Sequence, residues 1–186
     1  MTSTADDWLN EFNSAALLAQ QGSFPEALAV LNELTPRLTK DPTLTPKFHV
    51  MFELRRAYLC SMVGDRNESL RRFSAAMKIA YEQVQEDSEV CTVYRQLLET
   101  IRNWKDWKLL LETAKRLCIL AGEKGFRLAA LEASYHMPFA YKGLGERQQA
   151  REYAMAILQR AREVECQGEI DASTEFIREL DTPLQA

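Results

Sequence analysis

The sequence has little glycine and proline and no long apolar run. Only 7 glycines and 6 prolines occur among 186 residues, whereas the two residue types together usually make up about 12% of a globular chain. This scarcity argues against β-sandwiches and barrels, which need many turns, and favours a helical chain. No uninterrupted apolar stretch approaches the roughly 18 residues that a membrane-spanning helix requires, so we expect no membrane association.

Side chains that bind metals or perform catalysis are also scarce. The chain has 2 histidines, and none of its 4 cysteines forms a CxxC pair of the kind that zinc sites and dithiol chemistry use. Glu132 and His136 lie one helical turn apart and could share a metal, but no third ligand is visible near them. We therefore expect a protein that is not an enzyme and that uses no metal or cofactor.

The charge balance excludes another class of function. The net charge is −4, and neither half of the chain has more basic than acidic residues, so binding to nucleic acid is not expected. The first residues contain no basic region followed by an apolar stretch, as a secretory signal would. The expected location is cytoplasmic.

What the sequence does contain is helical periodicity with clear boundary signals. Apolar residues recur at spacings of three and four, which is typical of helices with one buried face. Thr45 followed by Pro46 predicts a helix start, and so do Asp65 and Asp106, whose side chains can accept hydrogen bonds from free backbone amides. Together the signals predict nine helices. Pro138 falls inside one of them, which predicts a kink near His136 and Met137.

The predicted turns between paired helices recur at a regular interval. Gly22, Gly64, Lys105 and Gly145 are 42, 41 and 40 residues apart, and each ends one helix shortly before the next begins. Small residues occur at fixed distances from most of these turns. They allow two antiparallel helices to approach closely, so the pattern predicts a series of helical hairpins.

This pattern resembles the tetratricopeptide repeat (TPR) family. Ser69 and Phe73 match the small and aromatic residues of that family's second helix, although the interval exceeds the family's 34 residues and points to a longer-repeat branch. The resemblance implies an all-α fold and a single domain over residues 1–186, in which four hairpins form a right-handed solenoid and a C-terminal helix covers its last apolar face. The expected repeats are about 7–39, 46–86, 89–121 and 126–167, and the expected capping helix is about 172–180.

In this family the first helices of successive hairpins line a concave groove that binds ligands. The second hairpin offers mainly apolar groove positions, Met51 and Leu54 among them, and later hairpins offer more charged ones. The resemblance therefore implies apolar contact and anion recognition along one groove. The groove residues expected to bind are Phe12, Tyr58, Met62, Arg95, Glu99, Arg102, Tyr135, Phe139 and Lys142.

These residues favour a non-enzymatic adaptor that binds a peptide or helix of a partner protein in its concave groove. Two alternatives stay open. The chain could be a regulatory sensor for a short peptide or an anionic small molecule, or it could form a homodimer or larger homo-oligomer through its apolar groove positions. Equally, the apolar positions could pack against neighbouring helices, and the arginines could pair with Glu99 or Glu132.

Overall fold

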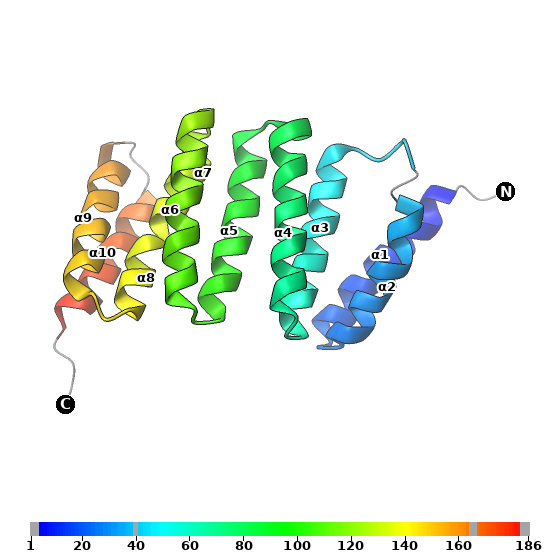
Figure 1. Ribbon diagram of the computed structural model, residues 1–186, viewed down its shortest axis with the longest axis horizontal. Helices are drawn as coiled ribbons and strands as arrows, with labels where there is room; N and C mark the ends of the chain where they lie inside the picture. Colours follow the sequence, from blue (N-terminus) through cyan, green and yellow to red (C-terminus); the bar gives the residue numbers. More distant parts are fainter. Residues whose placement is uncertain (1–3, 39–40, 164–166, 183–186) are drawn as a thin grey trace. The chain divides into compact units, whose positions relative to one another are not determined.

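The computed structural model describes residues 4–38, 41–163 and 167–182, and every element in those ranges is helical. Figure 1 shows the elements in chain order. By its internal contacts the chain divides into two units, Met1–Gln96 and Leu97–Ala186. The single domain expected from the sequence stays a prediction. No helix among the described residues is both long enough and apolar enough to cross a membrane.

The first unit contains two antiparallel hairpins and the start of a third. Its elements are α1 (Thr4–Gln20), α2 (Phe24–Leu38), α3 (Pro46–Met62), α4 (Arg66–Ile79), the π-helical turn η1 (Ala80–Val84) and the first part of α5 (Asp87–Asn103). Helix α1 packs against α2, and α3 packs against α4 and also contacts α2.

The second unit contains the end of α5 and five further helices. These are α6 (Trp107–Lys124), α7 (Arg127–Tyr135), α8 (Met137–Gly143), α9 (Arg147–Glu163) and α10 (Gln167–Asp181). Helix α6 packs against α7 and α8, and α9 packs against α8 and α10. The order of elements matches the predicted series of four hairpins followed by one further helix.

The predicted turn interval is confirmed by the backbone. Gly22, Gly64, Lys105 and Gly145 all have positive φ, at 82°, 86°, 58° and 83°. A residue in this left-handed conformation ends an α-helix by turning the chain out of it, and glycine adopts it without steric cost. Lys105 does the same in the third turn without that advantage. The four turns are therefore equivalent, which explains why the interval could be read from the sequence.

The helix starts are capped as predicted at three positions. The Thr45 side chain accepts a hydrogen bond from the Phe48 amide, and Pro46 is the first residue of α3. Asp65 and Asp106 cap α4 and α6 in the same way.

The predicted start of the last helix is wrong. Helix α10 begins at Gln167 rather than near residue 172, and Asp171 lies inside it. The Asp171 carboxylate accepts a hydrogen bond from the Gln167 side-chain amide at 2.7 Å. This hydrogen bond joins residues four apart, which face each other across one helical turn, so it supports the extra turn at the start of α10.

Pro138 interrupts its helix as predicted. The helix is divided at His136, which lies between α7 and α8, and Pro138 occupies the first turn of α8. Proline has no amide hydrogen to donate to the carbonyl of Ser134, and its ring crowds that carbonyl. This interruption turns one predicted helix into two, so the nine predicted helices become ten α-helices in the described chain. The π-helical turn η1 is separate and follows α4.

Small side chains occupy the closest approaches between paired helices. Ala15, Ala27 and Ala57 are fully buried. Ser69 is also fully buried, and its hydroxyl donates to the Ala57 carbonyl at 2.8 Å. This bond joins α4 to α3 where a larger residue would separate them. The spacing of small residues that suggested hairpins thus reflects real helix contacts.

Candidate functional site

An open groove lies between α3 and the first part of α5, within the first unit. These are the first helices of two successive hairpins. The groove has a volume of about 630 Å³, which falls within the usual range of ligand pockets. Its lining residues are Lys47, Phe48, Val50, Met51, Leu54, Arg55 and Tyr58 from α3, and Glu89, Thr92 and Gln96 from α5.

The α3 wall of this groove is mostly apolar. Met51, Leu54, Arg55 and Tyr58 follow one another at spacings of three, one and three residues, which places them on one face of the helix. The Tyr58 side chain is 45% exposed and Met51 is 42% exposed. The ring of Phe24 meets that of Tyr58 edge to face, with centroids 6.4 Å apart. Tyr58 is therefore supported from the α2 side while one face of it remains open.

The end of the groove at the start of α3 is electrostatically mixed. The Lys47 ammonium lies 2.6 Å from a Glu86 carboxylate oxygen. This hydrogen bond raises the pKa of Lys47, and the charge of Glu89 contributes in the same direction. Glu89 and Lys47 both line the groove. At this end of the groove the positive charge of Lys47 is therefore balanced by Glu86 and Glu89.

Arg55 is held differently. Its guanidinium carbon lies 4.8 Å from the centre of the Phe12 ring in α1, within the range of a cation–π contact. Phe12 is only 5% exposed, and its ring packs beside those of Phe48 and Phe52. Arg55 therefore stacks on a ring that the core keeps in place.

The residues predicted for the first unit are placed in different environments. Tyr58 lines the groove, as do Met51 and Leu54. Phe12 is buried behind the groove wall, where it contacts the lining residues Arg55 and Phe48. Met62 is 45% exposed but lies beyond the lining residues.

Two further predicted residues lie on exposed positions of α5. Neither Arg95 nor Glu99 is among the groove-lining residues, although Gln96 beside Arg95 is. One guanidinium nitrogen of Arg95 is 4.0 Å from the Cys91 sulfur.

The remaining predicted residues belong to the second unit, where they contact one another or α10. The Phe139 and Phe176 ring centroids are 4.6 Å apart, and the Lys142 ammonium is 2.7 Å from a Glu179 carboxylate oxygen. Arg102 stacks over the Phe139 ring at 4.9 Å. Tyr135 meets the same ring at 5.4 Å. These contacts are intramolecular, so the binding role of these four residues stays a prediction.

Sequence reasoning missed several residues of the groove. Lys47, Phe48 and Arg55 were not singled out, nor was the polar α5 wall of Glu89, Thr92 and Gln96. The family pattern assigns only about four groove positions to each first helix, so other residues on the same face are missed. The helical spacing of Arg55, one residue after Leu54 and four after Met51, is the signal that could have added it.

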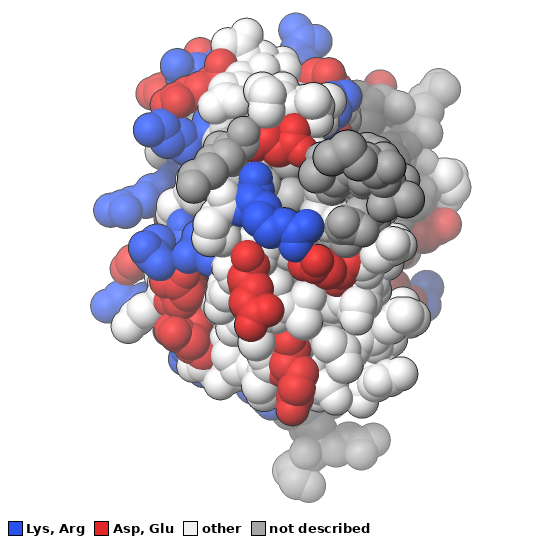
Figure 2. Space-filling model, turned by 90° about the vertical axis from the view of Figure 1, so that its right-hand side faces the viewer, with Lys and Arg blue, Asp and Glu red and all other residues white. Residues whose placement is uncertain are grey.

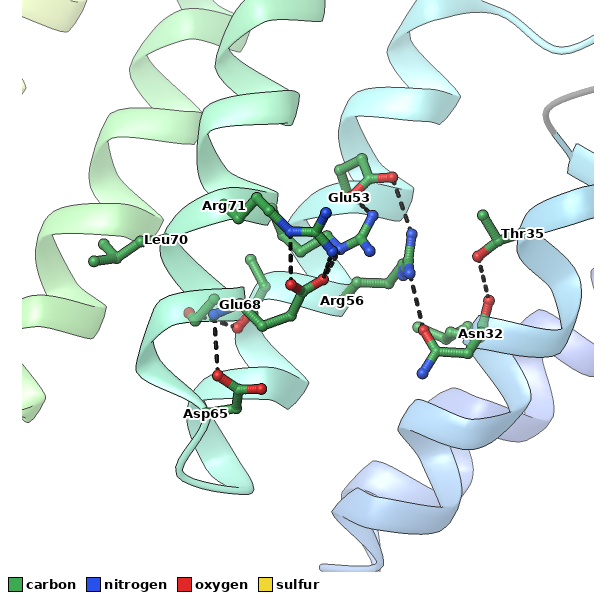
Figure 3. Close-up of polar contacts among 12 residues, drawn as sticks. Asn32, Thr35, Glu53, Arg56, Asp65, Glu68, Leu70 and Arg71 are labelled. Carbon is green, nitrogen blue, oxygen red and sulfur yellow. Dashed lines mark hydrogen bonds and ion pairs between the residues drawn. The ribbon is translucent and has the colours of Figure 1, made fainter.

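The opposite side of α3 holds a network of ion pairs that fixes α3 to its neighbours (Figure 3). A Glu53 carboxylate pairs with Arg56 at 3.2 Å and with Arg72 of α4 at 3.3 Å. The Glu68 carboxylate accepts from Arg71 and Arg72 at 2.7 and 2.6 Å. The network joins α3 to α4 and holds the helix that forms the apolar groove wall.

Acid should weaken this network at Glu68. Hydrogen bonds from Arg71 and Arg72 lower the pKa of Glu68 from 4.5 to about 2. A carboxylate with a depressed folded-state pKa stabilises the fold above its unfolded pKa, and this contribution is lost as the pH falls through the folded value. We expect Glu68→Gln to lower the urea midpoint at pH 7 but to have little effect near pH 2. Parallel pH profiles for the two proteins would contradict this.

Glu132 and His136, which were considered from the sequence as possible metal ligands, form one pair in the structure. The His136 Nε2 atom is 3.3 Å from a Glu132 carboxylate oxygen, and His136 is buried where α7 and α8 meet. No group of three potential metal ligands occurs in the described part of the chain.

The surface gives no sign of a basic patch on the one face shown in Figure 2. This face carries α1 and α2, and acidic and basic side chains are interspersed there among uncharged ones. Between α1 and α2, the Arg37 guanidinium pairs with the Glu11 carboxylate at 2.7 Å. Among the described residues, this face therefore offers no continuous surface of one sign.

Comparison with known proteins identifies the fold. No family model and no curated protein matches the sequence. Two solved structures are similar to it, both described as putative kinesin light chain nearly identical TPR-like repeats from Podosopora anserina, one of them a single-substitution variant of the other. The variant has a TM-score of 0.60 and 13% identity over 97% of this chain and 95% of its own. The other structure has a TM-score of 0.59 and 13% identity over 100% and 99%.

At this identity the likeness concerns the fold alone. The chain is an all-α helical-repeat protein with TPR-like hairpins, as the resemblance in the sequence implied. Its function has to be argued from its own groove.

Proposed function

We propose that this protein is a non-enzymatic interaction module that binds a peptide or helix of a partner protein in the groove between α3 and α5. The observation that carries the proposal is the exposure of Met51 and Tyr58 in an open groove of about 630 Å³. Large apolar side chains left exposed along one concave surface are typical of binding sites.

The chemistry of the two walls suits a peptide. The α3 wall offers apolar contact through Met51, Leu54 and Tyr58, whereas Thr92 and Gln96 on the α5 wall can donate and accept hydrogen bonds. A peptide needs both kinds of contact because it carries apolar side chains on a polar backbone. The TPR-like fold supports the same function, since the first helices of successive hairpins form the usual ligand surface of such repeats.

Methionine methyl signals provide a direct test of the proposal. We expect peptides selected from a display library against the intact chain to shift the NMR signal of the Met51 methyl group. Met155, an exposed residue of α9 in the second unit, serves as the internal control and should stay unchanged. A shift confined to Met155, or a library from which no peptide binds, would contradict the proposal.

The same peptides allow a mutational test. Tyr58→Ala should weaken their binding tenfold or more, because aromatic side chains in such pockets often contribute over 1 kcal/mol. Leu128→Ala is the matched control, because Leu128 is also a large exposed residue but lies in α7. The circular-dichroism melt should be nearly unchanged in both variants. Equal affinity of the wild type and Tyr58→Ala would show that the peptides bind elsewhere.

A further inference from the structure

Arg55 is the one side chain of the groove whose charge is both fixed in place and left unmatched, among the residues that the structure describes. Its guanidinium stacks 4.8 Å from the centre of the Phe12 ring. Phe12 is a core residue, so it cannot move aside without disturbing the packing of Phe48 and Phe52. A stacked guanidinium keeps its N–H groups in the plane of the fork, where they can bind an anion edge-on. Little side-chain entropy then remains to be lost on binding.

Lys47, the other cation of the groove, is in the opposite situation. It is paired with Glu86 at 2.6 Å. Within the described ranges of the chain, Arg55 stacks on Phe12 and forms no ion pair. Arg55 is half-buried in the groove wall, where screening by water is weaker than at a fully exposed site. A ligand carboxylate could therefore bind Arg55 without first breaking an ion pair within the protein.

The groove also has an electrostatic direction. Glu86 and Glu89 lie at its Lys47 end. Arg55 lies eight residues further along α3, which corresponds to roughly 12 Å of helix. An acidic ligand group is repelled at the first end and attracted at the second, so the two ends are not equivalent. A single guanidinium with glutamates in the same groove suits a singly charged carboxylate better than a doubly charged phosphate.

We propose that Arg55 is the specificity-determining residue of the groove and selects peptides that carry an aspartate or glutamate next to their apolar anchors. This inference rests on the peptide-binding function proposed above and adds the chemical class of the peptide. The apolar anchors contact Met51, Leu54 and Tyr58. The carboxylate accepts two hydrogen bonds from the Arg55 fork, which sets the direction in which the peptide lies.

The inference can be tested with an array of short synthetic peptides. Each carries leucine and phenylalanine anchors at helical spacing, and each is made in three forms that differ at one position, with glutamate, glutamine or phosphoserine. We expect the intact wild-type chain to retain the glutamate form about tenfold more tightly than its glutamine partner, as one charge-assisted pair of hydrogen bonds would provide. Arg55→Gln should bind the glutamate and glutamine peptides with equal affinity, and that affinity should be the one with which the wild type binds the glutamine peptide.

Two further variants separate recognition from simple charge. Arg55→Lys keeps the charge but lacks the planar fork, so its preference for glutamate should fall well below that of the wild type. Arg116→Gln removes one charge from an exposed position of α6 and should leave the preference unchanged. A loss of preference in Arg116→Gln as well would overturn the inference, because net charge would then explain the selection.

The outcomes distinguish this inference from the proposed function. If the wild type retains glutamate and glutamine peptides equally, the groove binds peptides but Arg55 does not select carboxylates. If it prefers phosphoserine to glutamate, the assigned ligand class is wrong. If it retains no peptide of any form, the proposed function itself is contradicted.

Discussion

Replacing Gly143 with alanine should destabilise the second unit by about 1–3 kcal/mol, the range typical of overpacking a close contact. Gly143 is the last residue of α8, and Trp107 is the first residue of α6. A Cβ atom at residue 143 would lie well inside 3.0 Å of three atoms of the Trp107 ring. Because an indole ring cannot compress, either the ring or the helix end must move. Urea unfolding followed by circular dichroism measures the loss.

Gly122→Ala is a matched control for this prediction. Gly122 lies inside α6, and a Cβ atom there would have no neighbour within 4 Å. Alanine in a helix interior is favoured over glycine by roughly 0.8–1 kcal/mol, so this variant should be slightly more stable than the wild type. Gly143→Ala should lower the free energy of unfolding less in a Trp107→Ala background than in the wild-type background. Equal losses in both backgrounds would show that the ring is not the obstacle.

The Trp107 contact shows which part of the fold could be predicted from the sequence. The turns at Gly64 and Lys105 were visible because each turn imposes a local backbone requirement at a regular interval. The kink at Pro138 was visible because proline lacks an amide hydrogen. The pairing of Trp107 with Gly143 was not visible, because it depends on how two helices distant in sequence approach each other.

The candidate site could be predicted only in part, for a similar reason. Tyr58 was found because it occupies a groove position of the repeat pattern. Phe12 was predicted from the same pattern, at the position of the first hairpin that corresponds to Leu54, yet it is buried against Phe48 and Phe52. An apolar residue on the inner face of a helix can meet either the groove or the next helix, and its spacing is the same in both cases. Arg55 depends on Phe12 in α1, so the local sequence around it gave no indication of its role.

Charge patterns were equally ambiguous at Arg56. In the sequence it follows Arg55 and resembles another solvated basic residue. In the structure it is only 5% exposed, and its guanidinium donates to Asn32 at 2.9 Å and to Glu53 at 3.2 Å. Burial lowers its pKa, with Glu53 acting in the opposite direction. Arg56 thus connects α3 to α2 from within the packed region (Figure 3).

Removing this buried arginine should have the largest effect on the first unit. We expect Arg56→Ala to cost about 3–5 kcal/mol, as does breaking other buried ion pairs, because Glu53 would lose one of its two cations while staying largely buried. The arginine stem also packs near Phe52, with its guanidinium carbon 5.6 Å from the ring centre. The loss of that packing adds to the electrostatic cost. The free energy of unfolding in urea measures the sum.

Arg71→Ala separates burial from ion pairing as the cause of this effect. Arg71 belongs to the same network and pairs with Glu68 at 2.7 Å, but its side chain is 70% exposed. Exposed ion pairs usually contribute under about 1 kcal/mol, because water solvates both partners when the pair breaks. Arg71→Ala should therefore cost several-fold less than Arg56→Ala, and added salt should reduce its cost further. Similar costs for the two variants would mean that the network acts through charge alone and that burying Arg56 between α2 and α3 contributes nothing.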